Sequence, residues 1–299
     1  CSALQDEAQI RDAAGRYTVF GRVSPLQKKE LVAAMKQQGH TVAMTGDGVN
    51  DVLALKESDC SVAMASGSEA ARNISQLVLL DSNFDAMPRV VAEGRRSVNN
   101  LQRSATLFLV KTMYSALLAI LFLFIPKPYP FLPIHLTLIS SLTIGAPAFV
   151  LALEPNHNRI EGSFNKNILA RCIPGGLSIV IGVCLSVLLG HVIGLPDEQT
   201  STLCVLLTAF SSFLLLFKLC VPFHFWRRML YAGLLTVFGV CVALFSPFFS
   251  LTALSNWALA LLVLLMASLY GLFEIFSWAC SKLFQPSKKS KPAKNEIHL

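Results

Sequence analysis

The stretch TVAMTGDGVND, residues 41–51, decides the fold. In it a hydrophobic run ends in two glycines that are framed by aspartates. Gly46 and Gly48 allow a tight backbone turn, and Asp47 and Asp51 place carboxylates beside that turn. Mg²⁺ prefers to share its shell between a few carboxylates, waters and a phosphate. The stretch therefore predicts a Mg²⁺ site, whereas an isolated Asp-Gly pair would indicate only a solvated turn.

Strands and helices alternate on both sides of this stretch. Residues 17–23 predict a buried strand, and Ser24, Pro25 and Gln27 then predict a helix with a capping box, which stops at Gly39. A Rossmann-like α/β domain follows from the alternation, with a parallel, doubly wound sheet that binds ligands at the carboxyl ends of its strands. The further strands are predicted at 41–46, 60–64 and 76–80, with helices in DVLALKES and SEAARNIS.

Charge divides the 299 residues into two parts. Residues 1–103 hold twelve basic and twelve acidic residues, as a balanced soluble domain does. The rest holds thirteen basic and six acidic residues, so it carries the whole net charge of +7. This second part is predicted to consist of a membrane part, 104–281, and a basic tail, 282–299. The eight scattered cysteines form no C-x-x-C pair and are expected to be buried apolar residues.

Six apolar runs are long enough to cross a membrane as helices. Basic residues gather in every second loop, as the positive-inside rule requires if the first part and the C-terminus are cytoplasmic. We therefore expect a multi-pass plasma-membrane protein, in which an all-α bundle of six helices follows the α/β domain. The spans are predicted at about 104–125, 132–153, 172–194, 202–221, 229–249 and 256–280.

The motif resembles the hinge signature of the P-type ATPases, which are ion pumps with a haloacid dehalogenase-like phosphorylation domain. GRVSPLQKKELV resembles the segment just before it in these pumps, with Arg22, Pro25 and Lys28 on the family's pattern. The similarity continues through SVAMASGSEAARNISQLVLLDSNF and VVAEGRRSVNNLQRS. Six later spans resemble the branches with calcium, sodium–potassium and proton pumps, because heavy-metal pumps end after two.

The resemblance implies a role for each residue of the motif. Asp47 would bind Mg²⁺ beside the phosphorylated aspartate, with Asp51 as a second ligand and Asn50 supporting the site. Lys28 would contact the phosphoryl group, which Thr45 and Gly46 would also bind. This chain has no DKTGT, nucleotide-binding domain, TGE loop or first four membrane helices. We therefore expect it to be inactive alone, with ATP bound mainly by a missing N-terminal part of the polypeptide.

The second span carries the features expected of an ion path. Gly145 and Pro147 would break the helix near mid-membrane and free backbone carbonyls, which are tolerated there beside a cavity or an ion site. Ser140, Ser141 and Thr143 could add hydroxyl oxygens. The alternative is that glycine and proline are common in membrane helices and that the hydroxyls bond to their own backbone.

The acidic ligands of calcium pumps are missing from this path. By the resemblance, their aspartate and glutamate fall at Ile144 and Ser115. Lys111 lies in the same span as Ser115 and is either a built-in counter-charge, which would weaken divalent binding, or a side chain that snorkels to the interface. Lys218 and Glu274 lie near the ends of their spans, where snorkelling also explains them.

The sequence thus predicts part of an ATP-driven cation pump that works through an aspartyl phosphate with Mg²⁺. Its expected partners are membrane lipid, the transported cation and the remainder of the polypeptide, and no nucleic acid. Two alternatives stay open: a soluble haloacid dehalogenase-type phosphatase, and a non-catalytic membrane channel or scaffold. The transported ion is not resolved.

Overall fold

The computed structural model describes residues 6–160 and 162–284. The chain divides into two units, Cys1–Val91 and Ala92–Leu299. This division falls inside one long helix and not after residue 103, where the charge pattern had suggested a boundary. Residues 285–299, which form most of the predicted basic tail, lie outside the described residues.

The first unit contains a sheet of three parallel strands, in the order β1-β2-β3. The predicted α/β class is therefore confirmed. Both connections, which run through short helices, proceed in the same direction across the sheet. The reversal of strand order that defines a doubly wound sheet is not present among the described strands. The strands are β1 Ala43–Gly46, β2 Cys60–Met64 and β3 Leu77–Leu79.

Capping hydrogen bonds mark the start of helix α2 in this unit. Ser24 accepts a hydrogen bond from the backbone of Gln27 at 3.3 Å, and the Gln27 side chain accepts one from the Ser24 N–H at 3.1 Å. This is the predicted capping box. Between the sheet and the helices, Leu55, Ala63 and Ala71 form the buried core. The elements are α1 Glu7–Arg16, α2 Pro25–Gln37, η1 Val49–Asp51, α3 Val52–Glu57, α4 Glu69–Ile74 and η2 Phe84–Ala86.

The segment 17–23, predicted as a buried strand, is not a strand. Tyr17 and Val19 are 62% and 86% exposed, and Arg22 has a left-handed φ of 50°. The prediction came from the β-branched and aromatic composition, which favours a strand only where a neighbouring strand and a packed face are present. None of the described strands pairs with this segment.

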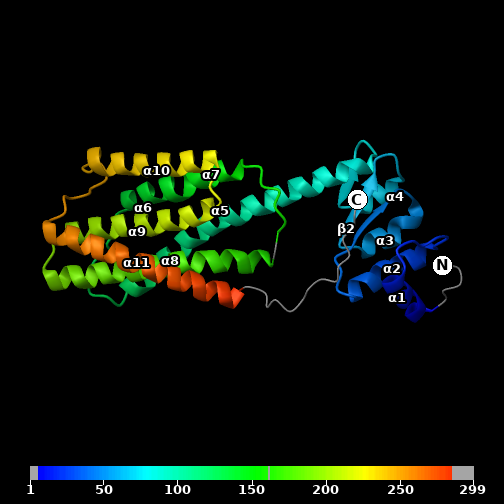
Figure 1. The fold of residues 1–299 in the computed structure, drawn as a ribbon, viewed down its shortest axis with the longest axis horizontal. Coiled ribbons are helices and arrows are strands. Elements are labelled where there is room, and N and C mark those ends of the chain that lie inside the picture. Colours follow the sequence, from blue (N-terminus) through cyan, green and yellow to red (C-terminus); the bar gives the residue numbers. More distant parts are fainter. Residues whose placement is uncertain (1–5, 161, 285–299) are drawn as a thin grey trace. The chain divides into compact units, whose positions relative to one another are not determined.

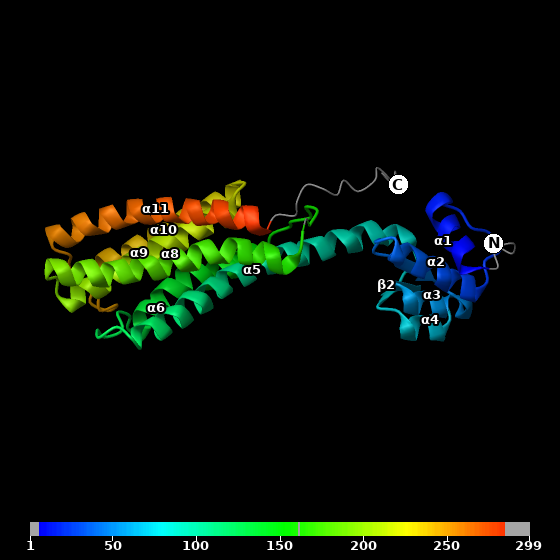
Figure 2. The same cartoon turned by 90° about the horizontal axis from the view of Figure 1, so that it is seen from below.

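The second unit is an all-helical bundle, and six of its helical segments are long and apolar enough to cross a membrane. Figures 1 and 2 show α8 running alongside α11, and both α9 and α11 pack against α8. Leu107, Tyr114, Ile139 and Leu216 are among its fully buried core residues. The helices are α5 Met87–Phe122, α6 Pro133–Ser140, the π-helix η3 Ser141–Gly145, α7 Ala146–Ala152, α8 Phe164–Ile193, α9 Asp197–Cys220, α10 Phe225–Leu244 and α11 Asn256–Phe284.

Two helices begin well before the apolar runs that predicted them. α5 begins at Met87, against an expected start near 104, and α8 begins at Phe164, against 172. Hydropathy marks only the part of a helix that lies in hydrocarbon, and a helix continues as long as its backbone bonds do. Arg171, expected in a loop, is therefore part of α8.

Candidate functional site

The loop between β1 and η1 lies at the carboxyl end of the parallel sheet, where the sequence predicted it. Asp47 and Gly48 form this loop, and Gly48 is the N-cap of η1. The strand before the loop pairs in register with β2, with Thr45 opposite Val62. Parallel sheets bind ligands at this edge, so the fold brings the motif to the position that phosphate chemistry needs.

Two glycines are required by close packing around the loop. A Cβ on Gly46 would lie 2.5 Å from the Cβ of Asp51, and one on Gly67 would lie 2.6 Å from the Asp47 carbonyl oxygen. The N–H of Ser68 donates to that same carbonyl oxygen at 2.7 Å. Residues 67 and 68, just before α4, therefore fix the backbone of Asp47. No local sequence pattern marks Gly67, because its partner Asp47 is 20 positions away along the chain.

Lys28 and Asp51 form an ion pair across the site. The Lys28 Nζ lies 2.6 Å from Asp51 Oδ1, and Asp51 Oδ2 accepts from the Gly48 N–H at 3.2 Å. The capping box of α2 places Lys28 in the first turn of that helix, facing η1. The Asp51 side chain is only 10% exposed, against 34% for Lys28. Asp51 thus stabilises the turn at Gly48 through a hydrogen bond and positions Lys28 through an ion pair.

The Asp47 carboxylate is open to a ligand. Asp47 is exposed, and within residues 6–160 and 162–284 its carboxylate makes no hydrogen bond or ion pair. Asn50 is exposed as well. No group of three or more His, Cys, Asp or Glu side chains gathers as a metal site in the described part of the chain. The residues fit Mg²⁺, which takes one or two carboxylates plus water and phosphate, with Asp47 as the free ligand.

In the bundle, the predicted helix break takes the form of the π-helix η3. The Ala146 N–H bonds to the Ser141 carbonyl, a spacing of five residues, and Pro147 has no N–H for the Thr143 carbonyl. Thr143 is fully buried, and its hydroxyl donates to Ile139 at 2.8 Å. The Ser140 hydroxyl likewise donates within its helix, to Leu136 at 2.5 Å.

The hydroxyls of Ser140 and Thr143 therefore donate hydrogen bonds to the backbone of their own helix, which is the alternative to an ion path that the sequence left open. Each hydroxyl oxygen can still accept a hydrogen bond. Gly145 is exposed at the end of η3, while Pro147 is buried. A π-turn in a membrane helix often marks a functional site. The backbone irregularity itself, more than the hydroxyl donors, is what distinguishes this helix.

Lys111 and Ser115 both lie half-buried on α5. Within the described part of the chain, Lys111 has no ion-pair partner. By contrast, Lys218 and Glu274 pair with each other at 2.6 Å, joining α9 to α11. The prediction that these two residues snorkel separately does not include this pairing, because 56 positions separate them along the chain.

Besides the hydroxyl of Tyr114 on α5, three buried hydroxyls in the bundle have no hydrogen-bond partner in the described structure. They belong to Ser178 on α8 and to Thr208 and Ser211 on α9, and all three residues are at most 1% exposed. Buried polar groups are normally paired. These residues were not predicted from the sequence, since a single serine or threonine in an apolar run carries no pattern.

A carboxylate joins three elements at the end of the bundle where α8 begins. Glu154, which follows α7, accepts from Arg227 Nε at 2.7 Å and Nη2 at 2.9 Å, and from Arg103 Nη1 at 2.6 Å. Burial alone would raise the pKa of Glu154, but the bonds from Arg227 and Arg103 outweigh it and lower that pKa. The two arginines come from α10 and α5, so the carboxylate ties these helices together.

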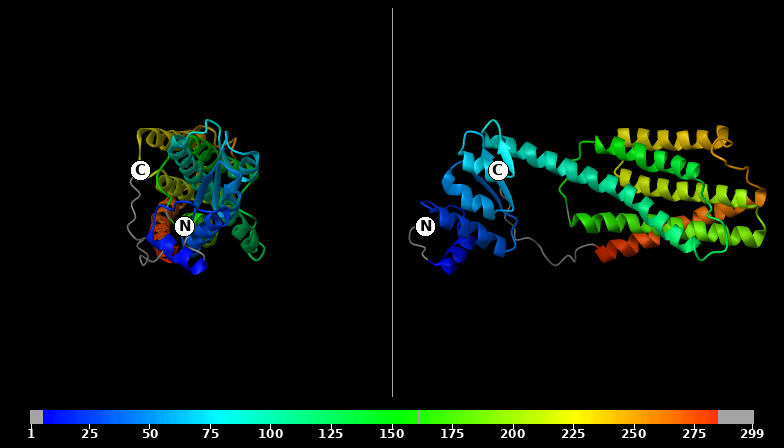
Figure 3. Two further views of the ribbon diagram at one scale, coloured as in Figure 1. Left: turned by 90° about the vertical axis from the view of Figure 1, so that its right-hand side faces the viewer. Right: turned by 180° about the vertical axis from the view of Figure 1, so that it is seen from behind.

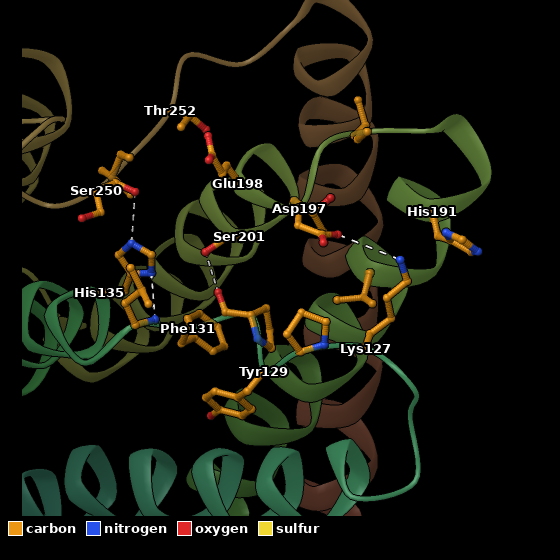
Figure 4. Close-up of a pocket in the computed structure, with 17 residues that line it drawn as sticks. Lys127, Tyr129, Phe131, His135, His191, Asp197, Glu198, Ser201, Ser250 and Thr252 are labelled. Atoms are coloured by element: carbon orange, nitrogen blue, oxygen red, sulfur yellow. Dashed lines mark hydrogen bonds and ion pairs between the residues drawn. The ribbon is translucent and has the colours of Figure 1, made fainter.

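A cavity of about 500 Å³ opens at the opposite end of the bundle, among the loops that precede α6, α9 and α11. Figure 4 shows His135 between two backbone groups: its Nδ1 accepts from the Leu132 N–H at 3.2 Å, and its Nε2 lies 3.4 Å from the Ser250 carbonyl oxygen. Lys127 and Asp197 form a loose ion pair at 4.0 Å across the mouth. Both nitrogens of His135 are engaged, so this residue holds loops together.

Fold and site together define a class: an α/β unit with an aspartate-bearing loop at the carboxyl edge of a parallel sheet, followed by six helices long and apolar enough to cross a membrane. The sequence comparisons agree with this. Residues 28–91 match the family model of haloacid dehalogenase-like hydrolases.

Three curated relatives extend the match into the bundle. The chain is 42% identical over 238 residues to the probable cation-transporting ATPase exp7 of Streptococcus pneumoniae, covering 77% of this chain and 30% of that protein. It is 45% identical over 229 residues to the calcium-transporting ATPase CtpE of Mycolicibacterium smegmatis, covering 72% and 29%. A calcium-transporting ATPase of Bacillus subtilis is 32% identical over 179 residues, covering 57% and 20%.

The haloacid dehalogenase-like match, the similarity to cation-transporting ATPases and the six apolar helices together fit a C-terminal part of a P-type ATPase. The chain spans less than a third of the length of these three relatives.

Proposed function

We propose that the complete polypeptide is an ATP-driven cation pump that works through an aspartyl-phosphate intermediate. One observation carries the proposal: an unengaged Asp47 carboxylate lies beside the Lys28–Asp51 pair, in a chain that continues into six apolar helices. A soluble phosphatase would need the first feature only. A channel or scaffold would need only the second.

The residues of the loop divide the chemistry between them. Asp47 would hold Mg²⁺, which would supply charge stabilisation for phosphoryl transfer. Lys28, which pairs with Asp51 at 2.6 Å, would contact the phosphoryl group through its remaining N–H groups. Thr45 and Gly46 would also bind the phosphoryl group, and Asn50 would support the site. The phosphorylated aspartate and most of the ATP contacts belong to the rest of the polypeptide.

The cation passes through the bundle beside η3. There Pro147 has no N–H to offer the carbonyl of Thr143, and carbonyl oxygen ligands suit a dehydrated cation. The unpartnered hydroxyls of Ser178, Thr208 and Ser211 extend the supply of oxygens toward α8 and α9. Gly145 belongs to the break, and Ser140 on α6 and Ser115 on α5 are further candidates for the path. The soluble domain and the C-terminus are cytoplasmic, in agreement with the loop charges.

The test compares transport by the complete polypeptide with and without the Asp47 carboxylate. We expect Asp47→Ala to abolish ATP-driven cation transport into sealed vesicles. Asp85→Ala, which removes an exposed carboxylate elsewhere in the same unit, should leave transport intact. Normal transport by Asp47→Ala would contradict the mechanism and favour a non-catalytic membrane protein. Partition of the protein into buffer, not detergent, would favour the soluble phosphatase.

In this proposal the charge of Lys111 determines whether the pump favours divalent or monovalent cations. Two relatives are named for calcium transport, yet a fixed ammonium beside a path without carboxylates opposes divalent cations. If Lys111 is a working counter-charge, Lys111→Ser raises the affinity for divalent cations, measured from the concentration that half-saturates transport. Unchanged affinity would mean that Lys111 only snorkels.

A further inference from the structure

A second cavity, of about 690 Å³, lies at the end of the bundle where α8 begins and α11 ends. Figure 3 shows these two helix ends at the same end of the bundle. The wall combines residues of α5, of the loop before α8, of α8 itself and of α11. Its polar side chains include Gln102, Arg159, Arg171, Ser277 and Ser281. The motif around Asp47 and the helix break at η3 contribute nothing to it.

The described lining is basic and has no acidic member. Arg159 and Arg171 are both exposed, and neither forms an ion pair with any described residue. The carboxylate of Glu154 is already bound by Arg103 and Arg227. Two guanidinium groups therefore line the cavity without a described counter-charge, and guanidinium recognises phosphate through paired N–H donors.

Neutral donors in the same wall also lack partners. Gln102 is 93% buried, as its exposed fraction is 7%, and its Nε2 makes no hydrogen bond in the described structure. A buried amide donor without an acceptor is costly. Ser163, the N-cap of α8, makes no side-chain capping bond, so the first N–H groups of this 30-residue helix are not capped by it. Such a helix start favours an anion.

Two aromatic features place this cavity at the level of lipid headgroups. Trp278 on α11 is 60% exposed, and Lys282 Nζ lies 3.9 Å above its ring. Exposed tryptophan with a basic neighbour is typical of the membrane–water interface. Phe284, which lines the cavity, is close in sequence to both. The donors thus open where phosphodiester groups of the bilayer are concentrated, and basic pockets of this kind bind anionic headgroups.

We propose that this cavity binds the phosphate group of an anionic phospholipid, with Arg159, Arg171 and Gln102 as its donors. The bound lipid ties α5, α8 and α11 together at this end of the bundle. This inference goes beyond transport and depends only on the protein lying in a membrane. A pump of any ion specificity could carry the site.

The experiment titrates phosphatidylglycerol into the complete polypeptide in phosphatidylcholine micelles and follows the thermal unfolding midpoint. We expect a saturable rise for the unmodified protein. Arg159→Ala and Arg171→Ala should each raise the half-saturating fraction of phosphatidylglycerol about fivefold, the equivalent of about 1 kcal/mol per basic side chain. Gln102→Leu, which removes the donor without changing the charge, should raise it as well.

The matched control is Arg228→Ala. Arg228 is exposed at the start of α10, at the same end of the bundle, and does not line the cavity. It should leave the titration unchanged. An equal rise of the half-saturating fraction in Arg228→Ala and Arg171→Ala would overturn the proposal, since it would show only the effect of a diffuse surface potential. An unchanged half-saturating fraction in every variant would overturn it as well.

Inorganic phosphate and glycerol 3-phosphate distinguish the source of the phosphate. We expect neither to raise the unfolding midpoint at millimolar concentration, because they lack the acyl chains that hold a headgroup at this depth. An equal, saturable rise with inorganic phosphate alone, lost in Arg171→Ala, would overturn the lipid assignment in favour of a soluble anion.

Discussion

At Gly67 the chain has no room for a side chain, because the backbone of Asp47 lies against it. A Cβ there would lie 2.6 Å from the Asp47 carbonyl oxygen and 2.9 Å from its Cα. Since backbone cannot move aside as a flexible side chain can, we expect Gly67→Ala to destabilise the domain by about 1–3 kcal/mol. It should also displace Asp47. Thermal unfolding, together with the Mg²⁺ concentration needed for phosphorylation, measures both effects.

Gly94→Ala is the control for this substitution. Gly94 lies inside α5, and nothing is within 4 Å of its added Cβ. Alanine is the better helix former by about 1 kcal/mol, so this variant should be neutral or slightly stabilised. If Gly67→Ala were equally well tolerated, the loop would not depend on the close approach to residue 67.

Among the helices, the clearest break is the π-helix before Pro147. Replacing this proline restores an N–H that can bond to the Thr143 carbonyl, so Pro147→Ala should regularise the helix. We expect the folded bundle to persist while the cation affinity falls at least about tenfold, a loss of about 1.4 kcal/mol in binding. Cation-dependent phosphorylation reports the affinity.

Pro174→Ala provides the comparison for Pro147→Ala. Pro174 is also buried, but α8 continues through it without a π-segment. The same change of residue there should leave the cation affinity as it is. Equal losses in both variants would show that the effect comes from general packing and not from the break at η3.

Glu154 ties α5 to α10, and its side chain is 20% exposed. Glu154→Gln leaves Arg103 and Arg227 without a counter-charge, so we expect it to cost about 3–5 kcal/mol of stability. Glu93→Gln, which breaks an exposed pair with Arg96, should cost less than about 1 kcal/mol. A loss at Glu154 as small as that at Glu93 would contradict the clamp.

The same carboxylate makes stability depend on pH. Arg227 and Arg103 lower the pKa of Glu154, so its contribution is complete above the ordinary pKa of about 4.3 and is lost as pH falls through the lowered value. The unfolding midpoint of the unmodified protein should therefore fall more steeply in acid than that of Glu154→Gln. Parallel curves for the two proteins would exclude this role.

The elements that could be predicted are those whose start or composition is set by neighbouring residues in the sequence. β2 was expected at 60–64 and is Cys60–Met64, and α2 begins at its capping box. The segment 17–23 failed as a strand because its composition could not show whether a neighbouring strand would be present. The early starts of α5 and α8 were not predicted, because hydropathy identifies only the apolar part of a helix and not the full length of its hydrogen-bonded backbone.

Across the whole molecule, the motif located the loop of the site, but the sequence did not show how its side chains pair. The Lys28–Asp51 contact joins residues 23 positions apart, and only the folded sheet and α2 bring them together. The unpartnered hydroxyls of Ser178, Thr208 and Ser211 are likewise invisible until α8 and α9 pack. Residue roles at the loop and in the ion path accordingly remain predictions.

In the proposed pump, the complete polypeptide couples phosphorylation to a cation. This coupling is tested by trapping the acid-stable phosphoenzyme formed from ATP in membranes, while Ca²⁺, Mg²⁺, Mn²⁺, Na⁺ and K⁺ are titrated separately. We expect a phosphoenzyme that requires Mg²⁺ and whose level changes with at least one further cation, through faster formation or faster loss. A phosphoenzyme that never forms, or one indifferent to every cation beyond Mg²⁺, would contradict it.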